Sequence, residues 1–261
     1  MITKLWSSAS GMLAQSFRID TIANNIANVN TTGYKKVDVQ FQDLLYNSIK
    51  TTGNPVELGA ENAMQVGQGV KPAGSKAYFL QGVPRETGRE LDLAIQGDGF
   101  FRVFHPDGQH RYTRAGNFNL DADGHVVTDD GYRVDLLPQE LLQIKFTSII
   151  VDRDGMVRLF NETGELMEEG AVEIFKFQNV EGLEAKGRNL WLSTENSGQP
   201  IAGRPGDAGF GTISQKFLEQ SNVNMTEEMT RLIMAQRSFE VSSRAVRTAD
   251  EMWALANQIR K

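Results

Sequence analysis

The helix-breaking residues of this chain are confined to its middle, and this feature constrains the fold most strongly. All seven prolines lie between Pro55 and Pro205. Only two glycines precede Gly53, and residues 212–261 contain neither glycine nor proline. Long helices can therefore form at both ends, on either side of a turn-rich middle segment.

Apolar residues near the N-terminus recur with the spacing of a coiled-coil helix. Leu5, Met12, Ile19 and Ile26 follow one another at intervals of seven residues. This pattern predicts a long amphipathic helix. We expect the helix to end near Gly33, because glycine readily adopts the left-handed conformation that terminates many helices.

The C-terminal end repeats the pattern and adds a line of small residues beside the large ones. Large side chains recur every seven residues at Met225, Leu232, Phe239, Val246 and Trp253. Small residues follow three positions after four of these, at Ala235, Ser242, Ala249 and Ala256. One such stripe is also typical of a helix in an ordinary globular core. Stripes at both ends favour pairing of the two helices, with neighbouring copies covering the apolar surface that remains.

Short apolar or alternating runs in the middle of the chain are separated by Asp-Gly pairs, which are typical of β-hairpin turns. Such pairs occur at 98–99, 107–108, 123–124, 130–131 and 154–155. The sequence therefore predicts an α+β fold with an inserted antiparallel all-β domain. We expect residues 1–33 and 218–261 to form a terminal coiled-coil assembly domain, 34–69 a connector, and 70–217 the β domain.

Composition excludes several functional classes. The net charge of −6 argues against nucleic acid as a partner, since phosphate binding requires clustered basic residues. The chain contains no cysteine, which removes disulfides, thiolate nucleophiles and cysteine-ligated zinc. No window approaches the ~20 apolar residues of a membrane-spanning helix. The first residues also lack the continuous apolar segment of a cleavable signal peptide.

Possible metal-binding and catalytic patterns are incomplete. The segments 121–124 and 152–155 both read Asp-x-Asp-Gly, as at the start of a calcium loop, but the remaining ligands and the closing glutamate do not follow. We interpret both as β-turns. His105 and His110 lie close in sequence without an identifiable third ligand. We therefore expect no metal, no cofactor and no catalytic residue, and hence no enzyme activity.

Asparagines cluster near the end of the expected N-terminal helix, at Asn24, Asn25 and Asn28. Because asparagine competes for backbone hydrogen bonds, the cluster could mark a frayed helix end. It could instead form a polar seam that fixes the register between packed copies, as buried asparagine does in coiled coils. Both interpretations are compatible with the sequence.

Four separated segments resemble signature segments of bacterial flagellar rod and hook proteins. They are Ala23–Lys35, Leu91–Phe101, Tyr112–Phe118 and, toward the C-terminus, Ser221–Asn224 with Gln236–Glu240. On this resemblance, which covers both ends and the middle, the chain is identified as a member of the flagellar basal-body rod family. It is most similar to distal-rod members, in its length and in residues 64–70. Residues 136–144 depart from the family pattern.

The resemblance implies a structural subunit that self-assembles into a rigid tubular drive shaft and transmits torque from motor to hook. It implies as partners further copies of the chain, proximal-rod and hook-side flagellar proteins, and the flagellar export apparatus, with the bushing rings as a further candidate. The implied location is the flagellar basal body in the periplasm and cell envelope, reached without a cleaved signal peptide.

On this interpretation, the assembly interface is formed by apolar side chains of both helices and by the asparagines that would set their register. These residues are Leu5, Met12, Ile19, Asn24, Asn25, Ile26, Asn28, Met225, Leu232, Phe239, Val246 and Trp253. Three alternatives stay open: a proximal-rod subunit of the same family, a peptidoglycan-related enzyme, and a glycan-binding β module with oligomerising helices.

Overall fold

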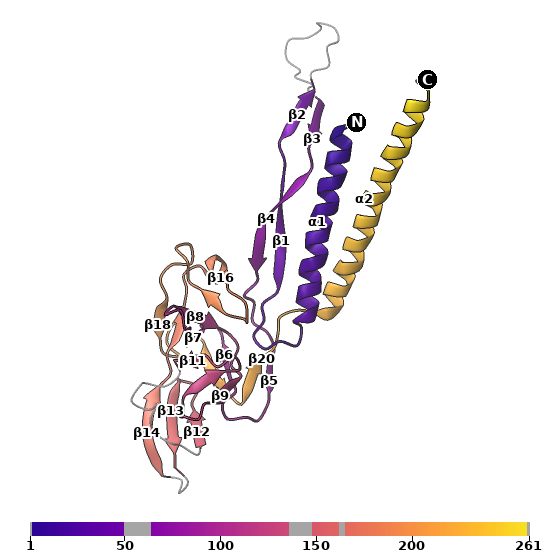
Figure 1. Cartoon of the computed structure of the whole chain (residues 1–261). Helices are drawn as coiled ribbons and strands as arrows, with labels where there is room; N and C mark the ends of the chain where they lie inside the picture. Colours follow the sequence, from indigo (N-terminus) through magenta and orange to yellow (C-terminus); the bar gives the residue numbers. More distant parts are fainter. Residues whose placement is uncertain (1, 50–63, 136–147, 162–164, 260–261) are drawn as a thin grey trace. The chain divides into compact units, whose positions relative to one another are not determined.

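A computed structural model describes residues 2–49, 64–135, 148–161 and 165–259 of the chain (Figure 1). The chain divides into two compact units. Unit 1 comprises residues 1–27, 37–76 and 224–261, and unit 2 comprises residues 28–36 and 77–223. Helices at the two ends and many antiparallel strands between them make this an α+β fold, as the sequence predicts.

Two long helices lie side by side in unit 1 (Figure 1). Helix α1 spans Ile2–Ala27 and helix α2 spans Met225–Ile259. The side chain of Asn224 accepts hydrogen bonds from the backbone N–H groups of Thr226 and Glu227, at 3.0 and 3.3 Å, and so caps the start of α2. No helix in the described part of the chain is long and apolar enough to cross a membrane.

Both helices are shorter at their inner ends than the expected ranges of 1–33 and 218–261. Helix α1 ends at Ala27, and a turn that begins with the hydrogen bond from Thr31 N–H to the Asn28 carbonyl follows it. Gly33 does adopt a left-handed φ of 66°, but within unit 2. There a Cβ atom on Gly33 would lie 2.6 Å from the backbone nitrogen of Ala115, so this position needs glycine for close approach as well.

A two-stranded β-ribbon completes unit 1 and runs beside α1 (Figure 1). Strand β1 (Val37–Asp43) pairs with β4 (Val70–Ala77), and β2 (Tyr46–Ile49) pairs with β3 (Met64–Gly67). The hydroxyl oxygen of Ser10 in α1 accepts a hydrogen bond from Val70 N–H at 3.3 Å. Most of the expected connector, 34–69, that the structure describes is therefore β-ribbon. Val70, where we expected the β domain to begin, lies in the same ribbon.

Unit 2 consists of short antiparallel strands. Its largest sheet has seven strands, in the order β16-β17-β8-β7-β11-β10-β9. A three-stranded sheet, β12-β13-β14, and the pairs β15-β18, β19-β6 and β20-β5 accompany it. The strands are β5 (Pro84–Glu86), β6 (Leu93–Gln96), β7 (Phe101–Phe104), β8 (His110–Thr113), β9 (Phe118–Leu120), β10 (Val126–Thr128), β11 (Arg133–Val134), β12 (Ser148–Val151), β13 (Met156–Phe160), β14 (Leu166–Ala171), β15 (Ile174–Lys176), β16 (Glu184–Ala185), β17 (Trp191–Leu192), β18 (Ile201–Gly203), β19 (Thr212–Gln215) and β20 (Phe217–Glu219).

Asp-Gly pairs close four hairpins of unit 2, which confirms the sequence interpretation for those turns. Gly108, Gly124, Gly131 and Gly155 have φ values of 77°, 85°, 81° and 76°, in the region that glycine occupies without strain. The main core between the sheets contains Phe101, Val103, Phe118, Leu159 and Ile213, all nearly inaccessible to solvent. Residues 136–147, which include the segment that departs from the family pattern, lie outside the described residues; 148–160 form β12 and β13.

Candidate assembly interface

The line of small residues on α2, and not the line of large ones, faces α1. Ala235 is buried, and so are Ala14 and Ile22 on α1. A Cβ atom on Gly11 would lie 3.9 Å from the Ser242 hydroxyl oxygen, so the two helices approach closely along this line. Small side chains therefore lie where the two helices approach closely.

The predicted large residues of α2 lie at the margin of this contact and stay partly exposed. Met225, Phe239 and Trp253 have 46%, 39% and 42% of their surface accessible, and Leu232 and Val246 are half-buried. These five residues therefore keep apolar surface that the partner helix of the same chain does not cover.

The predicted residues of α1 have a similar position. Met12, Ile19 and Ile26 are half-buried, and the side chain of Leu5 lies outside the described residues. A seven-residue repeat corresponds to 3.5 residues per turn, whereas a straight helix has 3.6. Residues chosen by that repeat therefore drift to one edge of the helix contact and miss its centre. The buried Ala14 could have been found by following the period of 3.6 residues.

Further large apolar side chains on both helices are more than half exposed. They are Trp6, Leu13, Met229, Ile233, Met234, Val241, Met252 and Leu255. Large apolar patches of this kind on a soluble chain mark interaction surfaces. The helix pair is thus covered on one side only within the described structure.

Asn25 joins three elements within one chain. Its side chain is buried, donates to the Val37 carbonyl at 2.8 Å and accepts from Val37 N–H at 3.1 Å. It also donates to Glu228 Oε2 on α2, at 3.2 Å. Of the other two predicted register residues, Asn24 is exposed, and Asn28 lies in unit 2 and accepts a hydrogen bond from the Thr31 hydroxyl. Of the three, Asn25 is the one that is buried in the described structure.

A buried carboxylate that the sequence analysis missed lies on the same face of α2 as Ala235. Glu228 is fully buried, and Arg231 lies beside it with ion pairs to Glu227 at 2.9 Å and Asp38 at 3.4 Å. Glu228 precedes Ala235 by seven residues. Extending the line of small residues by one heptad would have placed this acid in the helix contact.

Unit 2 contains a buried ionic cluster of Lys35, Glu219 and Arg114. The Lys35 ammonium lies 2.5 Å from Glu219 Oε1 and donates to the Leu80 carbonyl at 2.8 Å. Arg114 approaches Glu219 Oε2 at 3.6 Å and donates to the Gly97 carbonyl. Burial lowers the pKa of both Lys35 and Arg114, and the Glu219 carboxylate opposes this shift.

This cluster holds the strap, which we define as residues 28–36, against the β domain. Asn222 adds to it, because its side chain accepts from Lys36 N–H at 2.7 Å and donates to the Tyr78 and Leu80 carbonyls. The side chain of Asn189 also donates to the Thr32 carbonyl, at 2.8 Å. The strap thus belongs to unit 2 although it directly follows α1 in the sequence.

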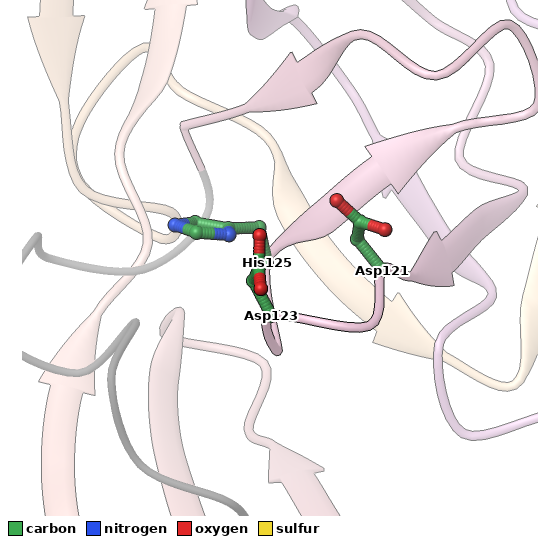
Figure 2. Close-up of side chains that lie close together, drawn as sticks. All are labelled: Asp121, Asp123 and His125. Carbon is green, nitrogen blue, oxygen red and sulfur yellow. The ribbon is translucent and has the colours of Figure 1, made fainter.

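Asp121, Asp123 and His125 are gathered at the turn between β9 and β10 (Figure 2). Potential ligand atoms of these three residues lie within 4.8 Å of one another. Both carboxylates are exposed, and Asp121 accepts hydrogen bonds from Ala122 and Gly124 N–H groups within the turn. In Figure 2 the His125 ring extends away from the Asp121 carboxylate. Residues 121–124 form a β-turn, as the sequence predicts.

Comparison with known protein families places the chain among the rod and hook proteins of the bacterial flagellum. Three family models match the chain in order: "Flagella basal body rod protein" at residues 5–35, "Flagellar hook protein FlgE/F/G D1 domain" at 94–159, and "Flagellar basal body rod FlgEFG protein C-terminal" at 214–259. The chain belongs to the flagellar basal-body rod protein family, and it is a structural rod subunit and not an enzyme.

Relatives named flagellar basal-body rod protein FlgG match along their whole length. The protein of Borreliella burgdorferi is 43% identical over all of both chains. Those of Caulobacter vibrioides and Bacillus subtilis are each 40% identical, over 98% and 97% of both chains. The flagellar hook protein FlgE of Helicobacter mustelae is 42% identical, but over 51% of this chain and 30% of the hook protein. The chain therefore resembles the rod relatives over a far greater length than the hook protein.

Proposed function

We propose that this chain is a distal-rod subunit that self-assembles through its terminal helices into a rigid tubular drive shaft. The shaft transmits torque from the motor to the hook. The observation that carries the proposal is the apolar surface left on α1 and α2 after they have packed against each other, as at Trp6, Ile233 and Val241, which are 70%, 59% and 66% exposed. Full-length similarity to proteins named FlgG supports the choice of the rod over the hook.

In this proposal unit 1 is the assembly domain, and its helices form coiled-coil contacts between copies. The partly exposed Met225, Phe239 and Trp253 act as knobs that insert between side chains of a neighbouring helix. Burying a large apolar side chain completely contributes about 1.5–3 kcal/mol, so several partly exposed ones per chain would stabilise an assembly substantially. Unit 2 then forms the outer wall of the tube.

The two ends of such a shaft would contact proximal-rod and hook-side flagellar proteins, and its outer surface would face the bushing rings. The chain would reach the periplasmic part of the basal body through the flagellar export apparatus.

Amide hydrogen exchange on the soluble chain and on sedimented assemblies tests the proposal. We expect added protection in α1 and α2 on assembly, because new helix contacts exclude water from their outer faces. Leu232→Asp places a charge at the half-buried margin of the helix contact, so this variant should stay monomeric at concentrations at which the wild-type chain sediments. Unchanged protection on assembly, or sedimentation of the variant, would contradict the proposal.

A further inference from the structure

Unit 2 exposes two apolar side chains on a loop between β4 and β5. We call residues 80–83 the knuckle. Leu80 and Val83 are 71% and 69% exposed, among the highest values for large apolar residues in the described part of the chain. Exposed apolar side chains on a loop contribute to binding chiefly when the loop is ordered in advance, because ordering it on contact costs free energy.

The backbone of the knuckle is held by hydrogen bonds at Leu80, Gly82 and Val83. The Leu80 carbonyl accepts from Lys35 and from Asn222, and Gly82 N–H donates to Glu219 Oε1 at 2.8 Å. The Val83 carbonyl accepts from Gln220 N–H at 3.0 Å. A Cβ atom on Gly82 would lie 1.8 Å from the Gln220 carbonyl oxygen, so the loop follows its supporting strand closely.

The side chain of Gln81 also holds the knuckle, through hydrogen bonds to the backbone of residues 95 and 97. It donates to the Ile95 carbonyl at 3.2 Å and accepts from Gly97 N–H at 3.0 Å. A buried ion pair such as Lys35–Glu219 is weak evidence for stability, because both charges must be removed from water. The position of this ion pair has a more specific effect, because Lys35 and Glu219 also hydrogen-bond to the backbone of the loop that carries Leu80 and Val83.

A complementary apolar surface lies on the first turns of α2. Met225, Met229 and Ile233 are spaced by four residues along one helix face and are 46%, 52% and 59% exposed. Methionine side chains are flexible and adapt to branched partners. Glu240 continues the same face and pairs with Arg237 of its own helix at 3.5 Å. Arg85 lies two residues after Val83, so a carboxylate flanks the helix face and a cation follows the knuckle.

We propose that the knuckle docks onto the Met225–Met229–Ile233 face of α2 in a second copy of this chain. The two surfaces differ, so the contact is heterologous. A heterologous contact leaves a free knuckle and a free helix face on each pair of copies, so it can continue from copy to copy and build a ring or a filament. This inference rests on the proposed function, to which it adds a contact made by unit 2.

A double substitution in the knuckle provides the first test. We expect Leu80→Ser with Val83→Ser to leave the unfolding transition of the soluble chain unchanged, because both side chains are largely exposed. The concentration at which half of the chain sediments should rise by at least about tenfold, which corresponds to ~1.4 kcal/mol. Ile201→Ser, at a residue 55% exposed in β18, is the matched control and should assemble normally.

The outcomes separate the two proposals. If the wild-type chain and the double variant assemble equally well, the knuckle contact is wrong and the proposed function stands. A wild-type chain that never assembles would overturn the proposed function, and the knuckle contact with it.

Cross-linking identifies the surface that the knuckle meets, and the absence of cysteine from the natural chain makes it specific. A Val83→Cys variant is mixed with a Met229→Cys variant, assembled and treated with a short bismaleimide. We expect a cross-linked dimer in this mixture and none when Ile201→Cys replaces Val83→Cys. Dimers formed by Val83→Cys alone would show a symmetric contact and overturn the proposal. Assembly without any cross-link to Met229→Cys would overturn it equally.

Discussion

At the scale of single residues, asparagine side chains make the hydrogen bonds that the backbone of a neighbouring strand would otherwise make. Asn25 offers both its oxygen and its nitrogen to the backbone of Val37, as a neighbouring strand would, and still reaches Glu228 on α2. Asn222 does the same for Lys36 and Tyr78 in unit 2. The cluster of asparagines in the sequence signalled a special role for Asn25. It did not indicate that the partner would be a strand of the same chain.

Replacing Asn25 with alanine should destabilise unit 1. The change removes the partner of both Val37 backbone groups and one donor to the buried Glu228, so we expect a loss of about 1–3 kcal/mol in the free energy of unfolding. Urea unfolding followed by helical circular dichroism measures this. Asn24→Ala is the control, because Asn24 is exposed and its substitution should change stability by less than ~0.5 kcal/mol. Equal effects of the two substitutions would contradict the role of Asn25.

Tyr112 gives unit 2 a defined response to high pH. Burial raises the pKa of its phenol, an effect that the nearby Arg102 partly opposes. Above pH ~10 the unfolded chain loses this proton while the folded chain keeps it, so the free energy of unfolding should fall by up to about 1.4 kcal/mol per pH unit. Tyr112→Phe should lack this component. Parallel stability curves for the two proteins from pH 8 to 11.5 would contradict the assignment.

At the scale of elements, the sequence patterns located the helices better than the surfaces they use. Seven-residue spacing correctly indicated helices at both ends, but the contact between α1 and α2 is centred on small residues such as Ala14 and Ala235. The β-ribbon was not recognised, although β1 (Val-Asp-Val-Gln-Phe-Gln-Asp) alternates like a strand. The reason is that its partner β4 begins after a long intervening segment. Such pairing is non-local, and local patterns carry no information about it.

Replacing a small residue in this line of α2 with a large one should therefore destabilise the packing of α2 against α1. Ser242→Leu introduces a branched side chain opposite Gly11, where the helices are close, and overpacking of this kind costs about 1–3 kcal/mol. Thermal unfolding monitored by helical circular dichroism should show the loss as a lower Tm. Met229→Leu, on an exposed face of α2, should leave the Tm within about 1–2 °C of the wild-type value. A tolerated Ser242→Leu would exclude close contact at this residue.

At the scale of the whole molecule, the two units interleave in sequence. The strap precedes the ribbon of unit 1, yet it is held by Glu219 and Asn222 near the end of unit 2. The domain limits expected at residues 33, 69 and 217 followed changes in composition, and these do not coincide with the units. Buried charges such as Lys35 could not be anticipated, since lysine is normally exposed and nothing local reveals a partner so far along the chain.

A fragment that retains the strap should fold without the helices. We expect residues 28–223 to show the near-ultraviolet circular dichroism of a packed aromatic cluster around Trp191 and Phe177. Residues 37–223 lack Lys35 and leave Glu219 buried without its closest cation, which should cost about 3–5 kcal/mol. Urea unfolding of both fragments provides the comparison. Equal stability would show that the strap is dispensable for unit 2.

The long separation between Lys35 and Glu219 also has a kinetic consequence. These residues meet across 184 positions, so the loop between them must close before their contact stabilises anything. Proteins dominated by such distant pairings fold slowly, because chain entropy is lost before the contacts that compensate for it are made. A chain that emerges from a narrow passage with its N-terminus first would keep its strap unanchored until β20 has emerged. Folding of unit 2 would then be completed only after β20 has emerged, so products truncated before β20 would not reach its native state.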